Sequence, residues 1–282
     1  MRIRGFAIVA AVVSTLVVSP LTERSFAERP TRPPKDNGIQ YHGGPILTST
    51  QDVYFIFYGN WTPNNSAQII LTDLATGLGG SPYFLINTTY TDLNGSRPSG
   101  GLIFGGSVFD AYSHGAALTE ADIADIVEGQ ILSLQLPLDA NGIYIVFGSA
   151  DVSAAGFCTQ LCQFHQEHAV LGTPVQYAFV GNPDRCPRVC GTQRIGPNGN
   201  AAADAMASWV AHVLSGTITN PTFQGWFDKR GRENSDKCVF EFGKTYITAN
   251  GAHANVKLGA RDFLLQENWV NADGGRCALH FP

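Results

Sequence analysis

The stretch "DVYFIFYG", residues 52–59, is the first segment of the chain that reads as a buried strand. It is a nearly continuous apolar run bounded by turn-forming residues, which is typical of a strand covered on both faces. The following segment, "SAQIILTDLATGLGG" (66–80), has apolar residues at helical spacing and ends in glycines, so a helix with its stop signal is predicted there. A buried strand followed by a helix indicates a sheet that helices cover.

The same kinds of element continue along the chain. Strands are predicted at 83–92, 100–113, 142–149 and 175–182. The segment 118–132 is predicted to be a helix, because Thr119 stands at a capping position with Asp122 three residues later. This order favours an α/β (α+β) fold with a single mixed β-sheet covered by helices, rather than a sandwich or a repeat array. From about residue 217 the chain is rich in glycine and asparagine, and a loop-rich C-terminal cap is expected.

The first 27 residues have the order of a secretory signal peptide. A short basic start precedes an apolar run, and the small-residue pattern "SFA" ends at Ala27, so cleavage is expected before Glu28. An uncleaved membrane anchor is the alternative, but serine, threonine and proline residues interrupt the apolar run. Residues 28–40 are proline-rich and are predicted to form a leader, and residues 41–282 a single domain.

The charge of the mature chain restricts its partners. Loss of residues 1–27 removes three of the 18 basic and one of the 23 acidic residues, which leaves a net charge of −7. A protein that binds nucleic acid or an anionic membrane presents a clustered positive field, and the sequence contains no basic block. We therefore expect a secreted, extracellular protein with no nucleic-acid partner and, after cleavage, no membrane attachment.

All six cysteines lie beyond the signal peptide, at Cys158, Cys162, Cys186, Cys190, Cys238 and Cys277. An even number in an exported chain predicts three disulfides. Cys238 and Cys277 alone lack a near neighbour and are expected to pair, so that their bridge staples the C-terminal cap. The other four form bridges either within or between "CTQLC" and "CPRVC". A zinc site on these two pairs is the alternative, but their C-x₃-C spacing differs from the C-x₂-C of most zinc ribbons.

The helix that begins after Asn200 carries two stripes. The apolar stripe consists of Met206, Trp209, Val210, Val213 and Leu214 and is expected to face the core. Asp204, Ser208 and His212 follow one another at i+4 on the opposite side, which we interpret as a polar face against the cysteine-rich loop or solvent. A Ser/His/Asp triad is disfavoured, because a triad nucleophile sits on a turn with its own oxyanion donors and no G-x-S-x-G occurs. A polar face predicts that His212→Ala costs under about 1 kcal/mol.

His212 is also a candidate metal ligand. In H-E-x-x-H, two histidines one turn apart bind zinc and the glutamate activates water, but here Val213 and Gly216 stand at the last two of these positions. The segment "QFHQEHAV" (163–170) is interpreted as a polar surface loop, with metal binding as the alternative. The candidate ligand set for that alternative is His212, Glu233, Asp236, His165 and His168.

Seven stretches, in order and with the expected spacing, resemble one family over the chain from about residue 38 to its end. They are "YHGGPILTSTQDVYFIFYGNW" (41–61), "DAYSHGAALTEADI" (110–123), "GFCTQLCQFH" (156–165), "YAFVGN" (177–182) with the "CPRVC" pair after it, "PNGNAAADAM" (197–206), "GTITNP" (216–221) and "RDFLLQENWVNADGGRC" (261–277). Together they are similar to the phosphate-induced, Exordium-like secreted proteins.

This resemblance implies secretion, in plants to the cell wall, and a link to growth and to carbon or phosphate status without an established reaction. Some bacterial relatives carry H-E-x-x-E and a following Asp-Pro on this helix, and then an "EN-x-DKC" segment. His212, Pro221 and residues 233–238 match that form, whereas Val213, Gly216 and Asn220 do not. The resemblance therefore implies a metallopeptidase-like core helix that has lost its catalytic glutamate.

Three hypotheses about function follow. The leading one is a non-catalytic protein without a cofactor that binds an extracellular ligand, a glycan or a peptide. The first alternative is a zinc-dependent hydrolase built on His212, against which the missing general base weighs. The second alternative is a glycan-binding module, for which Trp61 and Trp226 are the candidate exposed aromatic residues. Sequons at Asn60, Asn64, Asn87 and Asn94 would carry glycans only in a eukaryotic source.

Overall fold

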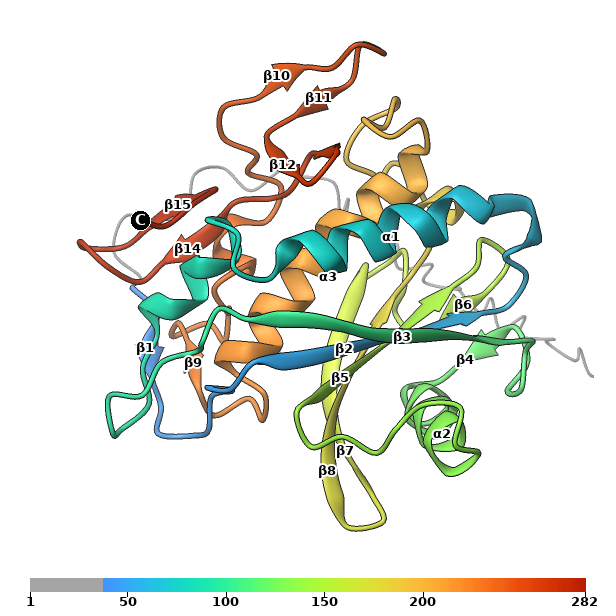
Figure 1. Ribbon diagram of the computed structural model, residues 1–282, viewed down its shortest axis with the longest axis horizontal. Helices are drawn as coiled ribbons and strands as arrows, with labels where there is room; N and C mark the ends of the chain where they lie inside the picture. Colours follow the sequence, from blue (N-terminus) through green and yellow to red (C-terminus); the bar gives the residue numbers. More distant parts are fainter. Residues whose placement is uncertain (1–37) are drawn as a thin grey trace, which may run out of the picture.

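The computed structural model describes residues 38–282, and Figure 1 shows helices packed on the two faces of one sheet. The expected signal peptide and most of the expected leader lie outside this range, so the division into signal peptide, leader and single domain stays a prediction. Between residues 38 and 282, no helix combines the length and the apolar character needed to cross a bilayer.

The main sheet has five strands in the order β3-β2-β5-β8-β7. Their bounds are β3 Leu102–Asp110, β2 Gln51–Tyr58, β5 Gly142–Gly148, β8 Thr173–Val180 and β7 Gln163–Val170. The first four strands are parallel and β7 runs antiparallel to β8, so the sheet is mixed, as predicted. Strands β2, β5 and β8 are buried almost throughout, which explains why their sequences are continuous apolar runs without alternation.

Three α-helices pack on this sheet: α1 (Asn65–Leu78), α2 (Glu120–Leu132) and α3 (Ala201–Thr219). Helix α1 links β2 to β3 on one side, and α2 links β3 back across β2 to β5. Right-handed crossovers in opposite directions place these two helices on opposite faces, and α3 lies beside α1 (Figure 1). At the start of α2, the Thr119 hydroxyl accepts the N–H of Asp122, whose carboxylate accepts the N–H of Thr119, so the predicted capping box is present.

Two segments differ from their predicted structure. Residues 83–92, expected to form a strand, contain the 3₁₀ helix η2 (Phe84–Thr89). There the side chains of Asn87, Thr88 and Thr89 each donate to the carbonyl three residues back, and such local hydrogen bonds compete with a strand ladder. Residues 163–170, expected to form a surface loop, are strand β7. The segment is a strand because it pairs with β8 along its whole length, and its polar sequence alone does not predict this pairing.

Helix α3 is buried along its whole length except for its first residue. The apolar stripe lies in the core as predicted, but the polar stripe does not face solvent. Asp204 accepts hydrogen bonds from Asn198, Ser208 accepts the N–H of Gln266 at 3.0 Å, and His212 bonds to Asp236. Of the two settings expected for this polar face, solvent was therefore wrong, because Asn198, Gln266 and Asp236 cover the three polar side chains and form hydrogen bonds with them.

The remaining residues of the described range, 38–282, form short elements and the loops between them. The small two-stranded pairs are β1 (Gln40–Tyr41) with β9 (Trp226–Phe227), β4 (Ala117–Leu118) with β6 (Ser153–Ala154), β10 (Tyr246–Ile247) with β11 (His253–Ala254), β12 (Val256–Leu258) with β13 (Arg261–Phe263), and β14 (Asn268–Val270) with β15 (Arg276–Ala278). The other 3₁₀ helices are η1 (Thr62–Asn64), η3 (Pro183–Arg185) and η4 (Asp236–Cys238). Beyond α3 the chain is therefore a cap of loops and hairpins.

Three disulfides fasten this architecture. Cys238 bonds to Cys277 within the C-terminal cap, which confirms the predicted pair. The remaining bridges join Cys158 to Cys186 and Cys162 to Cys190, so they run between the two C-x₃-C pairs and not within them. They tie the segment before β7 to the segment after β8, at one end of the hairpin that these strands form.

Candidate functional site

A group of histidines and carboxylates lies where α3, β7 and the loop before η4 meet. His212 comes from the fourth turn of α3, His165 from β7, and Glu233 and Asp236 from the "ENSDKC" segment. The structure thus brings together four of the five candidate ligands. The fifth, His168, stands three residues beyond His165 and therefore on the other face of the sheet, where its Nε2 lies 2.8 Å from Glu128 of α2.

His165 and Glu233 form a buried pair. The His165 Nε2 lies 3.1 and 3.0 Å from the two carboxylate oxygens of Glu233, and the side-chain amide of Asn220 donates to the same carboxylate at 2.6 Å. His165 is 6% exposed and Glu233 8% exposed. Burial of a carboxylate is energetically unfavourable unless hydrogen-bond donors surround it. His165 and Asn220 therefore stabilise Glu233 in its buried position.

Gly216 provides the space for this carboxylate. A Cβ at residue 216 would lie 2.4 Å from Oε2 of Glu233 and 3.3 Å from Nε2 of His165, so any other residue there would displace the pair. In the H-E-x-x-E form this position carries the second glutamate, and position 220 carries an aspartate. Here Glu233 fills the space beside the glycine, and Asn220 presents an N–H donor where an aspartate would present a second negative charge.

His212 and Asp236 form the adjoining pair. The His212 Nε2 lies 3.1 Å from Oδ1 of Asp236, and Oδ2 of Asp236 accepts the backbone N–H of Glu233 at 3.0 Å. Burial opposes ionisation of Asp236, but the hydrogen bond and charge of His212 together with the Glu233 N–H hold the pKa of that carboxyl below its usual value. His212 itself is only 3% exposed and its ring packs against the ring of Trp209. Asp236 thus links the two pairs.

A cavity of about 380 Å³ opens on this group. Glu120, His165, Glu233 and Asp236 contribute to its lining, and the ring of Phe223 stacks on His165 with centroids 4.9 Å apart. Within residues 38–282, neither His165 nor His212 has a hydrogen-bond partner at Nδ1. In each imidazole, Nε2 is therefore hydrogen-bonded to a carboxylate, and Nδ1 has no hydrogen-bond partner among the described residues.

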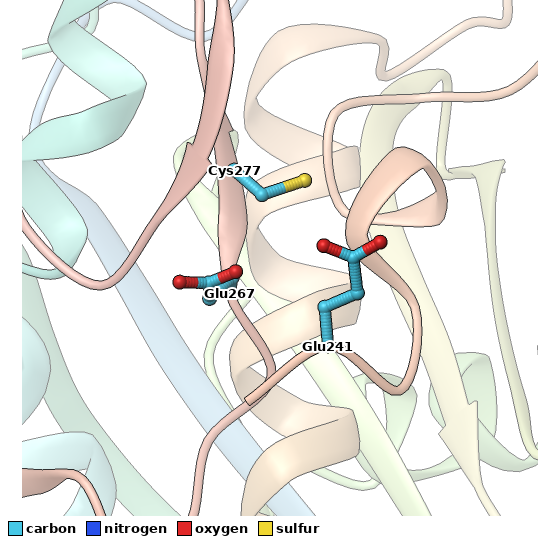
Figure 2. A group of neighbouring side chains, drawn as sticks. All are labelled: Glu241, Glu267 and Cys277. Atoms are coloured by element: carbon cyan, nitrogen blue, oxygen red, sulfur yellow. The ribbon is translucent and has the colours of Figure 1, made fainter. Parts of the chain in front are cut away.

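Two imidazoles and two carboxylates are zinc-type donors, but here they pair with one another. Among the described residues, the one group of three ligand-type side chains whose donor atoms all lie within 4.8 Å of one another is Glu241, Glu267 and Cys277, shown in Figure 2. The Cys277 sulfur is bonded to Cys238, so it is not the thiolate that binds metal. Burial and the charge of Glu241 raise the pKa of Glu267, as two close carboxylates require. This second group is therefore a weak metal-binding candidate.

The two tryptophans proposed as exposed aromatic residues are not free surfaces. Trp61 is 2% exposed and its Nε1 donates to the carbonyl of Tyr58, so the expectation for this residue was wrong. Trp226 is half-buried against the rings of Tyr41 and Tyr90. Phe223, which the sequence gave no reason to select, is the exposed aromatic residue at the histidine group.

Comparison with known proteins matches this chain to one family. The conserved region of phosphate-induced protein 1 matches residues 39–262. Protein EXORDIUM-like 5 of Arabidopsis thaliana is 31% identical over 67% of this chain and 59% of its own length, and Protein EXORDIUM-like 3 of the same plant is 31% identical over 67% and 64%. Protein PHOSPHATE-INDUCED 1 of Nicotiana tabacum is 30% identical over 69% and 68%. The chain thus spans about three fifths of the length of the two Arabidopsis relatives. No solved structure matches it.

Proposed function

Because the chain belongs to the phosphate-induced, Exordium-like family, we propose that it is a secreted, non-catalytic protein that acts in the extracellular space or cell wall, in growth or nutrient-status signalling. Three disulfides support secretion, since such bonds persist in oxidising compartments. The basic, apolar and small-residue order of residues 1–27 supports it independently.

The arrangement around Gly216 carries the non-catalytic part of this proposal. A zinc hydrolase keeps an open coordination position and a carboxylate that can take a proton from the bound water. In this chain Val213 stands where that carboxylate would be, and the Glu233 carboxylate is occupied by His165 and Asn220. Both carboxylates of the group therefore act as hydrogen-bond acceptors that stabilise the junction of α3, β7 and the cap.

A zinc-dependent hydrolase is the second candidate, favoured by one observation. His165, His212, Glu233 and Asp236 converge from three separate parts of the chain, and three of them line one cavity. Metal binding there would require each imidazole Nε2 to leave its carboxylate, or the free Nδ1 atoms to turn inward. Zinc would then compete with the hydrogen bonds that hold the group together.

Elemental analysis separates the two candidates. The protein is expressed with its own N-terminal segment, purified from the secreted fraction, and analysed for zinc before and after dialysis against EDTA. We expect far less than one zinc per chain and the same melting temperature with and without EDTA. One zinc per chain, lost on His212→Ala but kept on the control His168→Ala, would establish the metal site and remove the main support for the non-catalytic function.

The same preparation tests export. N-terminal sequencing of the secreted protein should return Glu28 or an immediate neighbour, because the small-residue pattern ends at Ala27. Recovery of a chain that begins at Met1 in the membrane fraction would contradict secretion.

A further inference from the structure

A second cavity, of about 630 Å³, lies at the opposite end of α3 from the histidine group. Its lining comes from the residues that directly follow β2, β5 and β8 and from the first turn of α3. These are Asn60 and Asn64 after β2, Ser149 and Asp151 after β5, Asn182 after β8, and Ala201 and Ala202 of α3. The cavity therefore sits at the carboxyl ends of three adjacent parallel strands.

The order of the strands indicates that this cavity lies where ligands commonly bind in open α/β sheets. From β2 the chain crosses to β3 on one side and then returns to β5 on the other, so the order of strands reverses between β2 and β5. In open α/β sheets the crevice at such a reversal, beyond the carboxyl ends of the strands, is the usual place for a ligand. Asn60 and Ser149 flank this crevice from its two sides.

One wall of the cavity supplies hydrogen-bond donors without partners. Asn182 is 2% exposed; its side-chain oxygen accepts the N–H of Asp184, while its Nδ2 donates to no residue between 38 and 282. The N–H groups of Ala201 and Ala202 stand at the free end of α3, because the Asn200 side chain caps only Ala203. The Asn182 Nδ2 is not among the buried polar atoms without a partner, so solvent in the cavity reaches it, and a ligand acceptor can take the place of that solvent.

The facing wall supplies acceptors. Asp151 accepts hydrogen bonds from the hydroxyls of Ser149, at 2.6 Å, and Tyr112, and these two bonds lower the pKa of its carboxyl. An ionised carboxylate has about four acceptor positions, so capacity remains for a ligand. Gly59 allows this arrangement: its φ is +95°, and a Cβ there would lie 2.1 Å from the Ser149 hydroxyl, which also accepts the N–H of Asn60.

These observations select a class of ligand. The carboxylates of Asp151 and Asp184 oppose an anion such as phosphate, and the N-terminal end of α3 together with the nearby Arg185 opposes a cation. A neutral hydroxyl donates one hydrogen bond and accepts two, so a ligand with several hydroxyls can satisfy both walls at once. We infer that this crevice binds a neutral saccharide. The inference concerns a different site from the histidine group and does not depend on whether that group holds zinc.

The test needs protein without attached glycans, because Asn60 and Asn64 lie in sequons and also line the cavity. The chain is therefore produced in the bacterial periplasm, with its disulfides formed. Calorimetric titration uses glucose, cellotriose, xylotriose, mannotriose and maltotriose as neutral probes, and trigalacturonate and inorganic phosphate as anionic ones. Cellotriose binding much tighter than glucose would point to a polysaccharide segment, and equal affinities to a free monosaccharide.

The variants locate the binding. Asn182→Ala and Asp151→Asn should each weaken binding of the neutral probe at least about tenfold, the effect of one lost hydrogen bond to a desolvated group. Ala201→Phe, at the partly exposed start of α3, fills the crevice and should abolish binding even if the other two variants fold poorly. Asp125→Asn, on the exposed face of α2, is the matched control and should leave the affinity unchanged.

Three results would overturn the inference. The first is that no neutral probe binds at concentrations up to about 10 mM, which corresponds to a binding free energy weaker than about −3 kcal/mol. The second is that the anionic probes bind in preference to the neutral ones. The third is that binding of the neutral probe survives Ala201→Phe.

Discussion

Replacing His212 by alanine should lower the free energy of unfolding by about 3 kcal/mol, well above the loss of under about 1 kcal/mol that a solvent-facing position predicts. The hydrogen bond to an ionised carboxylate contributes about 1.5 to 3 kcal/mol, and the lower figure applies because the Asp236 side chain is 39% exposed. Loss of a ring that is 3% exposed and packed on Trp209 adds about 1 to 2 kcal/mol for the space it leaves.

Urea unfolding with the disulfides intact measures this difference. His168→Ala is the matched control, because its side chain is 29% exposed and its partner Glu128 is also accessible, so its loss should cost under about 1 kcal/mol. In thermal melts, about 3 kcal/mol corresponds to about 6 to 12 °C for a domain of this size. If the two variants unfold at the same urea concentration, the burial of His212 and the importance of its pair with Asp236 are both refuted.

Three further predictions concern other contacts. Removing both Cys238 and Cys277, which are 39 residues apart, should cost about 3 to 4 kcal/mol, and hydrogen exchange should accelerate in the hairpins after α3 before it does in the main sheet; uniform acceleration would contradict the cap as a separate unit. Burial opposes ionisation of Asp228, but the backbone N–H groups of Arg232 and Arg230 and the guanidinium of Arg232 hold the pKa of its carboxyl below 3.8. The stabilising effect of Asp228 is therefore present above that pH and is lost as the pH falls through the lower folded value. Acid unfolding of Asp228→Asn should accordingly be less steep below about pH 4, and identical slopes would exclude this contribution. Thr119→Ala should cost about 1 kcal/mol in urea unfolding through loss of the capping box, and no change would mean that the cap is redundant.

Elements whose cause is local could be predicted from the sequence. Strands β2, β5 and β8 were found because burial on both faces leaves a continuous apolar run, and α2 because Thr119 and Asp122 lie three residues apart. Strand β7 was missed, since its polar sequence becomes a strand only through pairing with β8. The 3₁₀ helix at Phe84–Thr89 was missed because β-branched and aromatic residues favour strands unless their neighbours bond back to the chain.

The candidate site was predictable as a list of residues and not as an arrangement. His165, His212, Glu233 and Asp236 could be selected as ligand types, but which histidine pairs with which carboxylate depends on contacts 24 and 68 residues apart. Gly216 and Asn220 were recognised only as departures from the bacterial pattern. Gly216 leaves space for the Glu233 carboxylate and Asn220 donates a hydrogen bond to it, and both roles follow from distances that no spacing along the chain encodes.

The burial of α3 from Ala202 to Thr219 changes how random mutagenesis of this protein should be interpreted. An ordinary surface helix tolerates substitution at the positions that face water, so a survival profile rises and falls with each turn. Only the first residue of α3 is partly accessible. A mutant library selected for secretion should therefore show low tolerance of substitution at every position from Ala202 to Thr219. At those positions a loss of biological activity does not distinguish misfolding of the protein from loss of a functional contact. Positions outside this range, such as Asp151 and Phe223, are where the two can be told apart.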